Sequence, residues 1–267
     1  MFKSPPVEFQ SAPLWVWNDD VDEEEIDLQL QEMQQGGIGG VFIHPRPGLI
    51  TSYLSDRWFE LCRYTVDKAA ELGMEVWLYD ENSYPSGFAG GNVPAQMPES
   101  YNQGQGLVMQ HAKQLPDDIV DKFFIVLKKL GDKFEDITSK AQNEKGSSGD
   151  YYLFEKKYYG NSPWHGGYSY VDLLVPGVTE KFIDVTMTGY EKAIGNEFGK
   201  LVPGIFTDEP NINPPGGAKF TPSIFKDFEN KWGYDLKINL PSLFEEIGDW
   251  NVLRHNYYSL FLNLFID

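Results

Sequence analysis

Residues 76–91 read VWLYDENSYPSGFAGG, and this stretch joins an apolar run to two acids and a loop. The apolar run is short and continuous, which predicts a buried strand. Asp80 and Glu81 follow the run directly, and proline and glycine residues come soon after them. Because proline fixes φ and glycine permits unusual turns, we expect the loop to hold a defined shape. Two acids are therefore predicted at the carboxyl end of a buried strand.

Strands and helices alternate around this stretch. Apolar runs predict four strands, at residues 14–18, 40–44, 74–82 and 202–210. Asp22 and Ser55 have the residue type and position of N-caps for the helices that follow the first two strands. Continuous apolar strands separated by amphipathic helices are typical of a parallel sheet covered on both faces. The predicted fold class is α/β.

Residues 105–160 interrupt this alternation. The runs GLVMQ, KFFIVLKKL and YYLFEKKYY predict short strands, and a polar loop is expected at residues 139–150. Together they predict a small antiparallel β insertion. We therefore expect one domain in three parts: residues 1–104 with three β/α units, the insertion at 105–160, and residues 161–267 with the fourth unit and the helices after it.

The number of parallel strands is half of what a closed barrel needs. A (β/α)8 barrel has eight strands and typically about 250 residues without insertions. Four such strands in 267 residues predict the first half of a barrel. The apolar C-terminal stretch FLNLFID, residues 261–267, has no closing cap and suggests a fragment of a longer chain. An open α/β sheet that is complete as it stands is the alternative.

The formal net charge of −18 limits the classes of partner. A field of this sign repels nucleic acids and anionic membrane surfaces, so neither is expected as a partner. Neutral ligands such as sugars are compatible with it. The alternative is that the acidity only keeps the protein soluble.

Cys62 is the single cysteine, which excludes an internal disulfide, and its helical spacing with apolar neighbours predicts a core position. Residues 1–17 lack a long apolar leader, and no run approaches the roughly 18 apolar residues of a membrane span. These features favour a cytoplasmic bacterial protein. A mature secreted protein whose leader has been removed is the alternative.

The segment FTDEP, residues 206–210, carries two further acids at the end of the fourth predicted strand. Strand alternation sends Asp208 and Glu209 in opposite directions, so that one faces a pocket while the other accepts hydrogen bonds behind it. A glutamate in such a place is suited to general acid or base work. The structural alternative is a helix N-cap or a salt bridge.

Other side chains near the predicted strand ends suit a polyhydroxylated ligand. Asp80 and Glu81 can accept several hydrogen bonds, and Tyr84 offers a ring for the apolar face of a sugar. The alternative is an acidic loop that caps a helix. His44 and Arg46 can bind ligand oxygens, or Arg46 can pair with Asp80 or Glu81 and shift their pKa values.

Trp17 and Asn18 end the first strand, and Trp164 and His165 lie on a turn after the insertion. Exposed tryptophan rings serve as platforms for sugars, and core packing is the alternative for both tryptophans. The four histidines show no zinc-site spacing, so no metal ligands are predicted.

Five segments in order, WVWN, GGIGGVFIHPRPGLITSYLSDRWFE, LGMEVWLYDENSYPSGFAGG, VDLLVPGVTEKFI and GIFTDEP, resemble the catalytic barrel of family 106 glycoside hydrolases, the α-L-rhamnosidase family. The resemblance covers most of residues 14–210 outside the insertion. It implies a (β/α)8 barrel, hydrolysis of an α-linked deoxysugar, and, as an open option, a calcium ion near the site. It carries a catalytic role to Glu209 by its place in TDEP. Strands five to eight of the family barrel are not found here.

The expected function is therefore that of a glycosidase that cleaves a terminal sugar by carboxylate acid and base catalysis. Glu209 supplies one carboxyl group, and the second is either Glu81 or lies in the missing half of the barrel. One alternative is a fragment that binds carbohydrate without cleaving it. Another is a metal-dependent hydrolase of an ester or amide that uses Asp80, Asp208 and a histidine. The expected partners are a carbohydrate and either the missing barrel half or a second copy.

Overall fold

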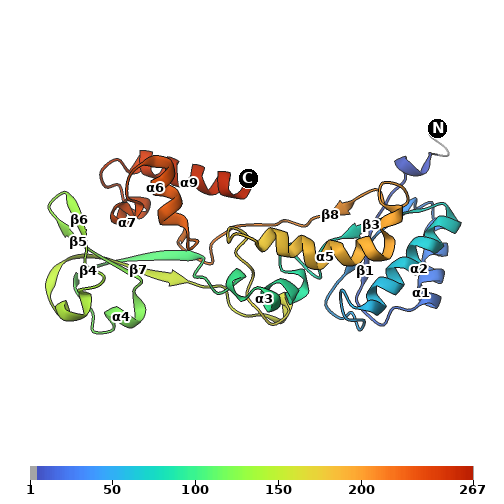
Figure 1. The fold of residues 1–267 in the computed structure, drawn as a ribbon, viewed down its shortest axis with the longest axis horizontal. Helices are drawn as coiled ribbons and strands as arrows, with labels where there is room; N and C mark the ends of the chain where they lie inside the picture. Colours follow the sequence, from blue (N-terminus) through green and yellow to red (C-terminus); the bar gives the residue numbers. More distant parts are fainter. Residues whose placement is uncertain (1–4, 267) are drawn as a thin grey trace. The chain divides into compact units, whose positions relative to one another are not determined.

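The computed structural model describes residues 5–266, so Met1–Ser4 and Asp267, which belong to the predicted leader-free N-terminus and uncapped C-terminus, lie outside the described residues. The chain forms two compact units (Figure 1). The first unit contains Met1–Pro98, Asn161–Val171 and Gly177–Asn211. The second contains Glu99–Gly160, Asp172–Pro176 and Ile212–Asp267.

A four-stranded parallel sheet forms the centre of the first unit. Its strand order is β1-β2-β3-β8, with the strands β1 (Leu14–Trp17), β2 (Gly40–Pro45), β3 (Glu75–Tyr79) and β8 (Ile205–Phe206). Every pairing in it is parallel. The predicted α/β class and the parallel sheet are confirmed. Within residues 5–266 the parallel sheet is open, and a complete barrel is not shown.

Three long helices accompany this sheet (Figure 1): α1 (Glu23–Gln35), α2 (Asp56–Leu72) and α5 (Val178–Ile194). The Asp22 carboxylate accepts a hydrogen bond from the Glu25 N–H at the start of α1, and the Ser55 hydroxyl accepts one from the Trp58 N–H at the start of α2. Both predicted N-caps are confirmed. Gly73 ends α2 in the left-handed conformation that glycine adopts without strain.

The core of the first unit lies between the three helices and one face of the sheet. Alternate strand residues pack against apolar side chains of the helices, among them Trp15, Trp17, Val41, Ile43, Val76 and Leu78. Residues at the intervening positions, such as Leu14 and Val16 in β1 and Phe206 in β8, remain 46%, 44% and 39% exposed. The prediction of cover on both faces was wrong, because the helices of this unit pack on only one of them.

Cys62 belongs to this core and has no exposed surface, as predicted. Burial raises the pKa of its thiol well above the ordinary value. The thiol is therefore an uncharged, small apolar group in the folded protein.

The fourth parallel strand is shorter than predicted. Residues 202–210 were expected to be extended, but β8 contains only Ile205 and Phe206. Pro203 has no N–H to give to a sheet ladder. Glu209 has a φ of 45°, which is outside the extended region. These two residues flank the part of the segment that pairs with β3.

The second unit contains an antiparallel sheet with the order β6-β5-β7-β4-β9. Its strands are β4 (Gly106–Gln114), β5 (Ile125–Leu130), β6 (Lys133–Asp136), β7 (Ser148–Lys157) and β9 (Ala218–Lys219). The predicted antiparallel strands of the insertion are confirmed. The expected loop at residues 139–150 instead holds a 3-10 turn and the start of β7. Because β9 pairs with β4, residues after 212 belong to the same unit as the insertion.

The remaining helices are short, except for the last. They are α3 (Asn92–Gln96), α4 (Ile119–Lys122), α6 (Ile224–Trp232), α7 (Leu236–Asn239), α8 (Pro241–Phe244) and α9 (Trp250–Ile266). Six 3-10 turns complete the described residues: Val7–Phe9, Ala89–Gly91, Pro98–Ser100, Ala141–Glu144, Pro163–His165 and Gly195–Glu197. Of the helices described, none combines the length and the apolar character needed to cross a membrane.

Candidate active site at the strand ends

The carboxyl ends of β3 and β8 bring two of the predicted acids together. Tyr79 pairs with Phe206, and the Asp80 N–H donates to the Phe206 carbonyl at 3.2 Å. The Thr207 hydroxyl donates to the Asp80 carboxylate at 2.7 Å. Parallel pairing thus places the segment after β3 beside the segment after β8, as the sequence predicted.

Ser86 connects the same two segments. Its hydroxyl donates to the Asp80 carboxylate at 2.5 Å and accepts from the Asp208 N–H at 2.9 Å. The Ser86 N–H donates to the Asp208 carbonyl at 2.7 Å. Burial raises the pKa of Asp80, while the hydrogen bonds from Ser86 and Thr207 act to lower it. Asp80 is 3% exposed, so its carboxyl group organises these loops from within the protein.

Asp208 accepts a hydrogen bond from Tyr79, whose ring stacks on that of His44. The Tyr79 hydroxyl donates a hydrogen bond to the Asp208 carboxylate. The Tyr79 ring stacks on the His44 ring, with centroids 3.7 Å apart. Burial, together with the hydrogen bond to Asp208, raises the pKa of Tyr79 well above its ordinary value. Asp208 is therefore an acceptor with a fixed position.

Glu209 differs from the other acids at this edge. It is exposed, and its carboxylate forms no hydrogen bond or ion pair with any residue of the described range 5–266. Its φ of 45° is a strained value for a residue with a side chain. Strain of this kind gathers at functional sites, where neighbouring structure maintains it. Asp208 accepts hydrogen bonds while Glu209 is exposed. That one of the two acids faces a substrate pocket stays a prediction.

Glu81 lies inside the loop that it begins. Its side chain has no exposed surface. Its two carboxylate oxygens accept hydrogen bonds of 2.5 to 3.1 Å from five backbone N–H groups, those of Asn82, Gly87, Phe88, Ala89 and Gly90. Burial acts to raise the pKa of Glu81, and these backbone N–H groups, which bind both oxygens of the ionised form, act against that rise. The geometry is that of a loop-organising residue, close to the structural alternative of an acid that caps a turn. The catalytic role predicted for Glu81 stays a prediction.

His44 is buried at the end of β2. It has no exposed surface, and neither ring nitrogen has a hydrogen-bond partner among the described residues. Burial lowers the pKa of His44 to about 4; the charge of Arg46 adds to the decrease and that of Asp208 opposes it. The imidazole is therefore neutral at pH 7.

The low pKa of His44 predicts acid sensitivity. The unfolded chain binds a proton at His44 near the ordinary pKa of 6.5, and the folded protein does so only near 4. Because the unfolded state binds the proton first as the pH falls, the contribution of His44 to the free energy of unfolding should be fully present above pH 6.5. It should decrease by about 2 to 3 kcal/mol towards pH 4. Urea unfolding across this range is the measurement. The His44→Phe variant should lose this component, and the exposed-site control His255→Gln should keep it. Equal slopes in wild type and His44→Phe would refute the assignment.

Arg46, Tyr84 and Trp164 form an exposed cluster. The Arg46 guanidinium lies 5.4 Å from the Tyr84 ring centroid and 5.8 Å from that of Trp164. The Trp164 indole N–H donates to the Tyr84 carbonyl at 2.6 Å, and the two rings are 40% and 37% exposed. Arg46 has no ion pair with a described residue, so the alternative in which it pairs with Asp80 or Glu81 is not observed. Its charge instead interacts with the faces of two rings.

Trp17 and His165 are less accessible than predicted. Trp17 is 1% exposed and contacts the rings of Trp15 and Trp58. It therefore corresponds to the core-packing alternative, not to a stacking platform. His165 packs on Phe88, and burial lowers its pKa. Asn18, next to Trp17, is exposed.

No carboxylate cluster is found among the described residues for the calcium ion that the resemblance leaves open. Within residues 5–266, no group of three or more His, Cys, Asp or Glu side chains is arranged to hold a metal ion. The carboxylates of Asp80 and Asp208 already accept hydrogen bonds from hydroxyl groups. No step is therefore assigned to a metal, and the metal-dependent alternative gains no support from this geometry.

Three hydroxyl residues of the site were missed by the sequence reasoning. Tyr79, Ser86 and Thr207 donate to Asp80 or Asp208. Tyr79 and Thr207 adjoin the two acid pairs in sequence, and this adjacency was the available signal. Ser86 had no such signal, because its role depends on how the loop after β3 folds back.

Comparison with solved structures found a similar fold in a rhamnosidase from Novosphingobium sp. PP1Y, with a TM-score of 0.60 and 11% sequence identity. The match covers 99% of this chain and 44% of that chain, so this chain spans less than half the length of that protein. No family model and no curated protein matched the sequence. At this identity the likeness shows a shared fold, which is mixed α/β with one parallel and one antiparallel sheet.

Proposed function

We propose that this protein is a glycoside hydrolase of the α-L-rhamnosidase type, in which Glu209 supplies one of the two catalytic carboxyl groups. The observation that carries the proposal is the exposed, unpartnered carboxylate of Glu209 at the carboxyl end of a parallel strand. This is the edge where parallel α/β enzymes place their chemistry. The fold shared with a rhamnosidase supports the same class of reaction.

The proposed chemistry depends on which of the four acids at the strand ends already accept hydrogen bonds. Asp80, Glu81 and Asp208 are occupied by hydroxyl or backbone donors, which leaves Glu209 free to exchange a proton with a substrate. Cleavage of a glycosidic bond needs a general acid at the leaving oxygen and a second carboxylate that activates water or attacks the anomeric carbon. Glu209 is assigned one of these roles. An inverting reaction would require the two carboxyl groups about 6.5 to 9.5 Å apart.

The exposed aromatic cluster supplies the means to hold a sugar. Tyr84 and Trp164 present ring surface, and Arg46 presents N–H donors between them. The loop that carries Tyr84 is tied to the segment of Glu209 through the hydrogen bonds between Ser86 and Asp208. In the proposed mechanism this cluster orients the sugar and Glu209 supplies one of the two carboxyl groups that act on its glycosidic bond.

The direct test is hydrolysis of a panel of 4-nitrophenyl glycosides, read as release of nitrophenolate. The expected result is release from the α-L-rhamnopyranoside in preference to the β-D-glucopyranoside and the other sugars. Absence of release from the whole panel would contradict the proposal. If calorimetry then still showed sugar binding, the chain would be a carbohydrate-binding protein, an alternative that the Arg46, Tyr84 and Trp164 cluster favours.

A further inference from the structure

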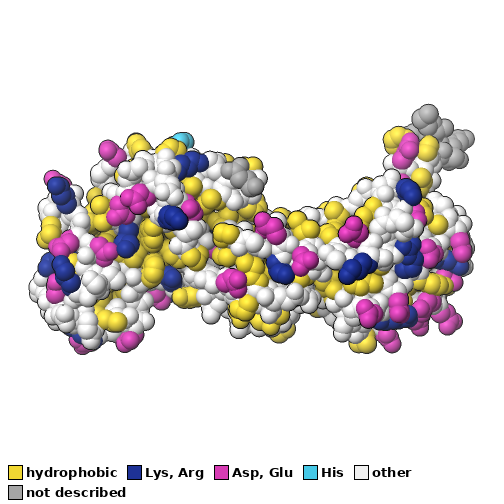
Figure 2. Space-filling view, in the orientation of Figure 1, with side chains coloured by type: hydrophobic (Ala, Val, Ile, Leu, Met, Phe, Trp, Pro, Cys, Tyr) yellow, Lys and Arg dark blue, Asp and Glu magenta, His cyan; other side chains and the backbone are white. Residues whose placement is uncertain are grey.

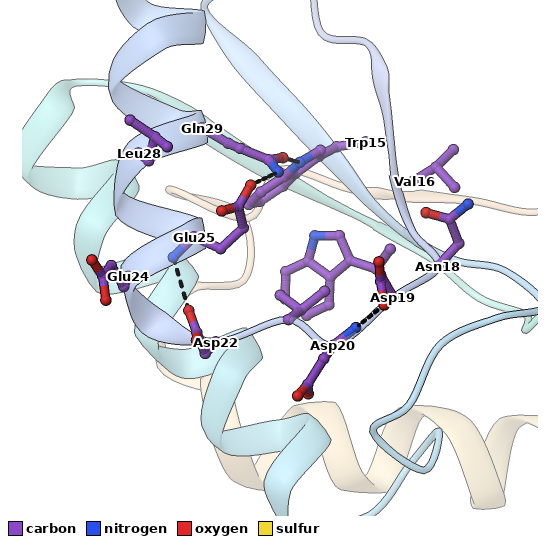
Figure 3. A pocket seen from close by; sticks show the side chains of 12 residues that line it. Trp15, Val16, Asn18, Asp19, Asp20, Asp22, Glu24, Glu25, Leu28 and Gln29 are labelled. Carbon is purple, nitrogen blue, oxygen red and sulfur yellow. Dashed lines mark hydrogen bonds between the residues drawn. The ribbon is translucent and has the colours of Figure 1, made fainter.

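Glu209 differs from the other exposed acids of the first unit in its backbone conformation. Figure 2 shows acidic side chains gathered around α1 and α2. Figure 3 shows some of these acids, Asp20, Asp22 and Glu24, at the start of α1. Within residues 5–266, Glu209 is the only Asp or Glu with a positive φ. Because this conformation costs free energy in a residue with a side chain, neighbouring contacts must maintain it.

Ser86 fixes the peptide group on the N-terminal side of Glu209. The Asp208 N–H donates to the Ser86 hydroxyl at 2.9 Å, and the Ser86 N–H donates to the Asp208 carbonyl at 2.7 Å. That carbonyl belongs to the planar peptide group that joins Asp208 to Glu209. The Ser86 hydroxyl also donates to the Asp80 carboxylate at 2.5 Å, and Ser86 is 1% exposed. The residue before Glu209 is therefore bound from within the protein at both of its backbone groups.

Tyr170 connects Ser86 to the C-terminal side of Glu209. Its hydroxyl donates to the Ser86 carbonyl at 2.7 Å and accepts from the Asn211 N–H at 3.4 Å. The Asn211 side-chain amide donates to the Glu209 carbonyl, also at 3.4 Å. Tyr170 is 3% exposed. Glu209 thus lies between two residues whose backbone groups are bound to Ser86 or to Tyr170.

The Tyr170 hydroxyl is also the point at which three segments of the candidate site are joined. Tyr170 follows the turn that carries Trp164, and its acceptor Ser86 follows Tyr84 on the loop after β3. Through Asn211 the same hydroxyl reaches the segment after β8. A hydroxyl can donate one hydrogen bond and accept another, so one tyrosine serves both partners. Phenylalanine would fill the same space without joining the segments.

We propose that Tyr170 and Ser86 are positioning residues that hold Glu209 in its left-handed conformation, at a fixed place relative to the exposed aromatic cluster. The proposal rests on the catalytic role assigned to Glu209 above. Neither residue contacts the substrate in it, because both act through the backbone on either side of Glu209. Catalytic groups must be held within about 0.5 Å of their productive position, and loss of either anchor would let the strained segment relax.

The first test measures the backbone of Glu209 and needs no substrate. In protein labelled with carbon-13 and nitrogen-15 glutamate, the Glu209 signal is the one that disappears in Glu209→Gln. Its Cα shift and its coupling between the amide and α protons report φ. The wild type should show a positive φ in solution. Tyr170→Phe and Ser86→Ala should each move both values towards those of a negative φ, since each change removes one anchor.

The second test separates kcat from KM in the hydrolysis of the aryl glycoside. Tyr170→Phe and Ser86→Ala should each lower kcat by about ten- to a hundredfold, the effect of a misplaced catalytic group, and leave KM within about twofold. In the Glu209→Gln background neither change should cause a further loss, because the carboxyl group that they position is absent. A general loss of structure would instead lower turnover in both backgrounds.

Tyr190→Phe and Ser242→Ala are the controls. Tyr190 is a buried tyrosine of the first unit whose hydroxyl accepts from the Trp58 indole, and Ser242 is a buried serine. Neither control should move the Glu209 signal or change kcat. A negative φ in the wild type, a Glu209 signal that both variants leave in place, or equal losses of turnover in the two backgrounds would overturn the proposal. Full turnover by Glu209→Gln, or no hydrolysis by the wild type, would count against the proposed function, and the Glu209 signal would then decide alone whether these residues hold its backbone.

Discussion

Replacing Glu209 with glutamine is expected to lower the turnover number for glycoside hydrolysis by a factor of about 10² to 10⁴, the usual contribution of a general acid or base. Glutamine keeps the size and the hydrogen-bonding capacity of the side chain but cannot exchange a proton. Because the carboxylate is exposed and has no partner in the described range, the substitution should leave the melting temperature within about 1 to 2 °C of the wild type.

The rates are measured with the aryl glycoside that the wild type hydrolyses fastest. Glu180→Gln is the matched control, since Glu180 is also exposed and lies in the first unit, in the first turn of α5. The control should retain full activity. Turnover by Glu209→Gln equal to that of the control would remove Glu209 from the mechanism.

Replacing Glu81 with glutamine is expected to act on stability. Five backbone N–H groups point at the carboxylate, two towards one oxygen and three towards the other. A glutamine would place its NH2 group against at least two of these donors. A buried donor left without an acceptor costs about 1 to 3 kcal/mol. The expected loss is therefore about 2 to 6 kcal/mol, seen as a melting temperature lower by roughly 5 to 15 °C.

Calorimetry on Glu81→Gln and on the Glu180→Gln control also separates the two roles considered for Glu81. A variant that is insoluble or melts early agrees with a loop-organising residue. A variant that melts like the wild type but no longer hydrolyses the substrate would show that Glu81 is the second catalytic carboxyl group, and that its hydrogen bonds contribute little to stability.

Local features of the fold were predictable because they depend on neighbours in sequence. The helix N-caps at Asp22 and Ser55, the glycine that ends α2 at residue 73, and the apolar runs of β1 to β3 all follow from side-chain type and spacing. The position at which the fourth strand ends could not be predicted from side-chain type and spacing, because the positive φ of Glu209 depends on how the segment packs.

The roles of individual site residues were less predictable for the same reason. Arg46 was considered as an ion-pair partner of Asp80 or Glu81, but its guanidinium lies over two rings, one of which is 118 residues away in the chain at position 164. Trp17 ends a strand that carries exposed and buried side chains alternately, and only the packed structure shows on which side its ring lies. Glu81 could equally have pointed outwards, and the folding of residues 87–90 around it decides its surroundings.

The buried position of Cys62 also makes its thiol a probe for the opening of the core around it. A thiol with no exposed surface and a raised pKa does not react with a thiol reagent until the surrounding core opens. Because Cys62 is the single cysteine, the reaction of one thiol with Ellman's reagent reports the first unit alone. The rate of that reaction in native buffer, compared with the rate for an exposed thiol, gives the free energy of opening of the core around Cys62.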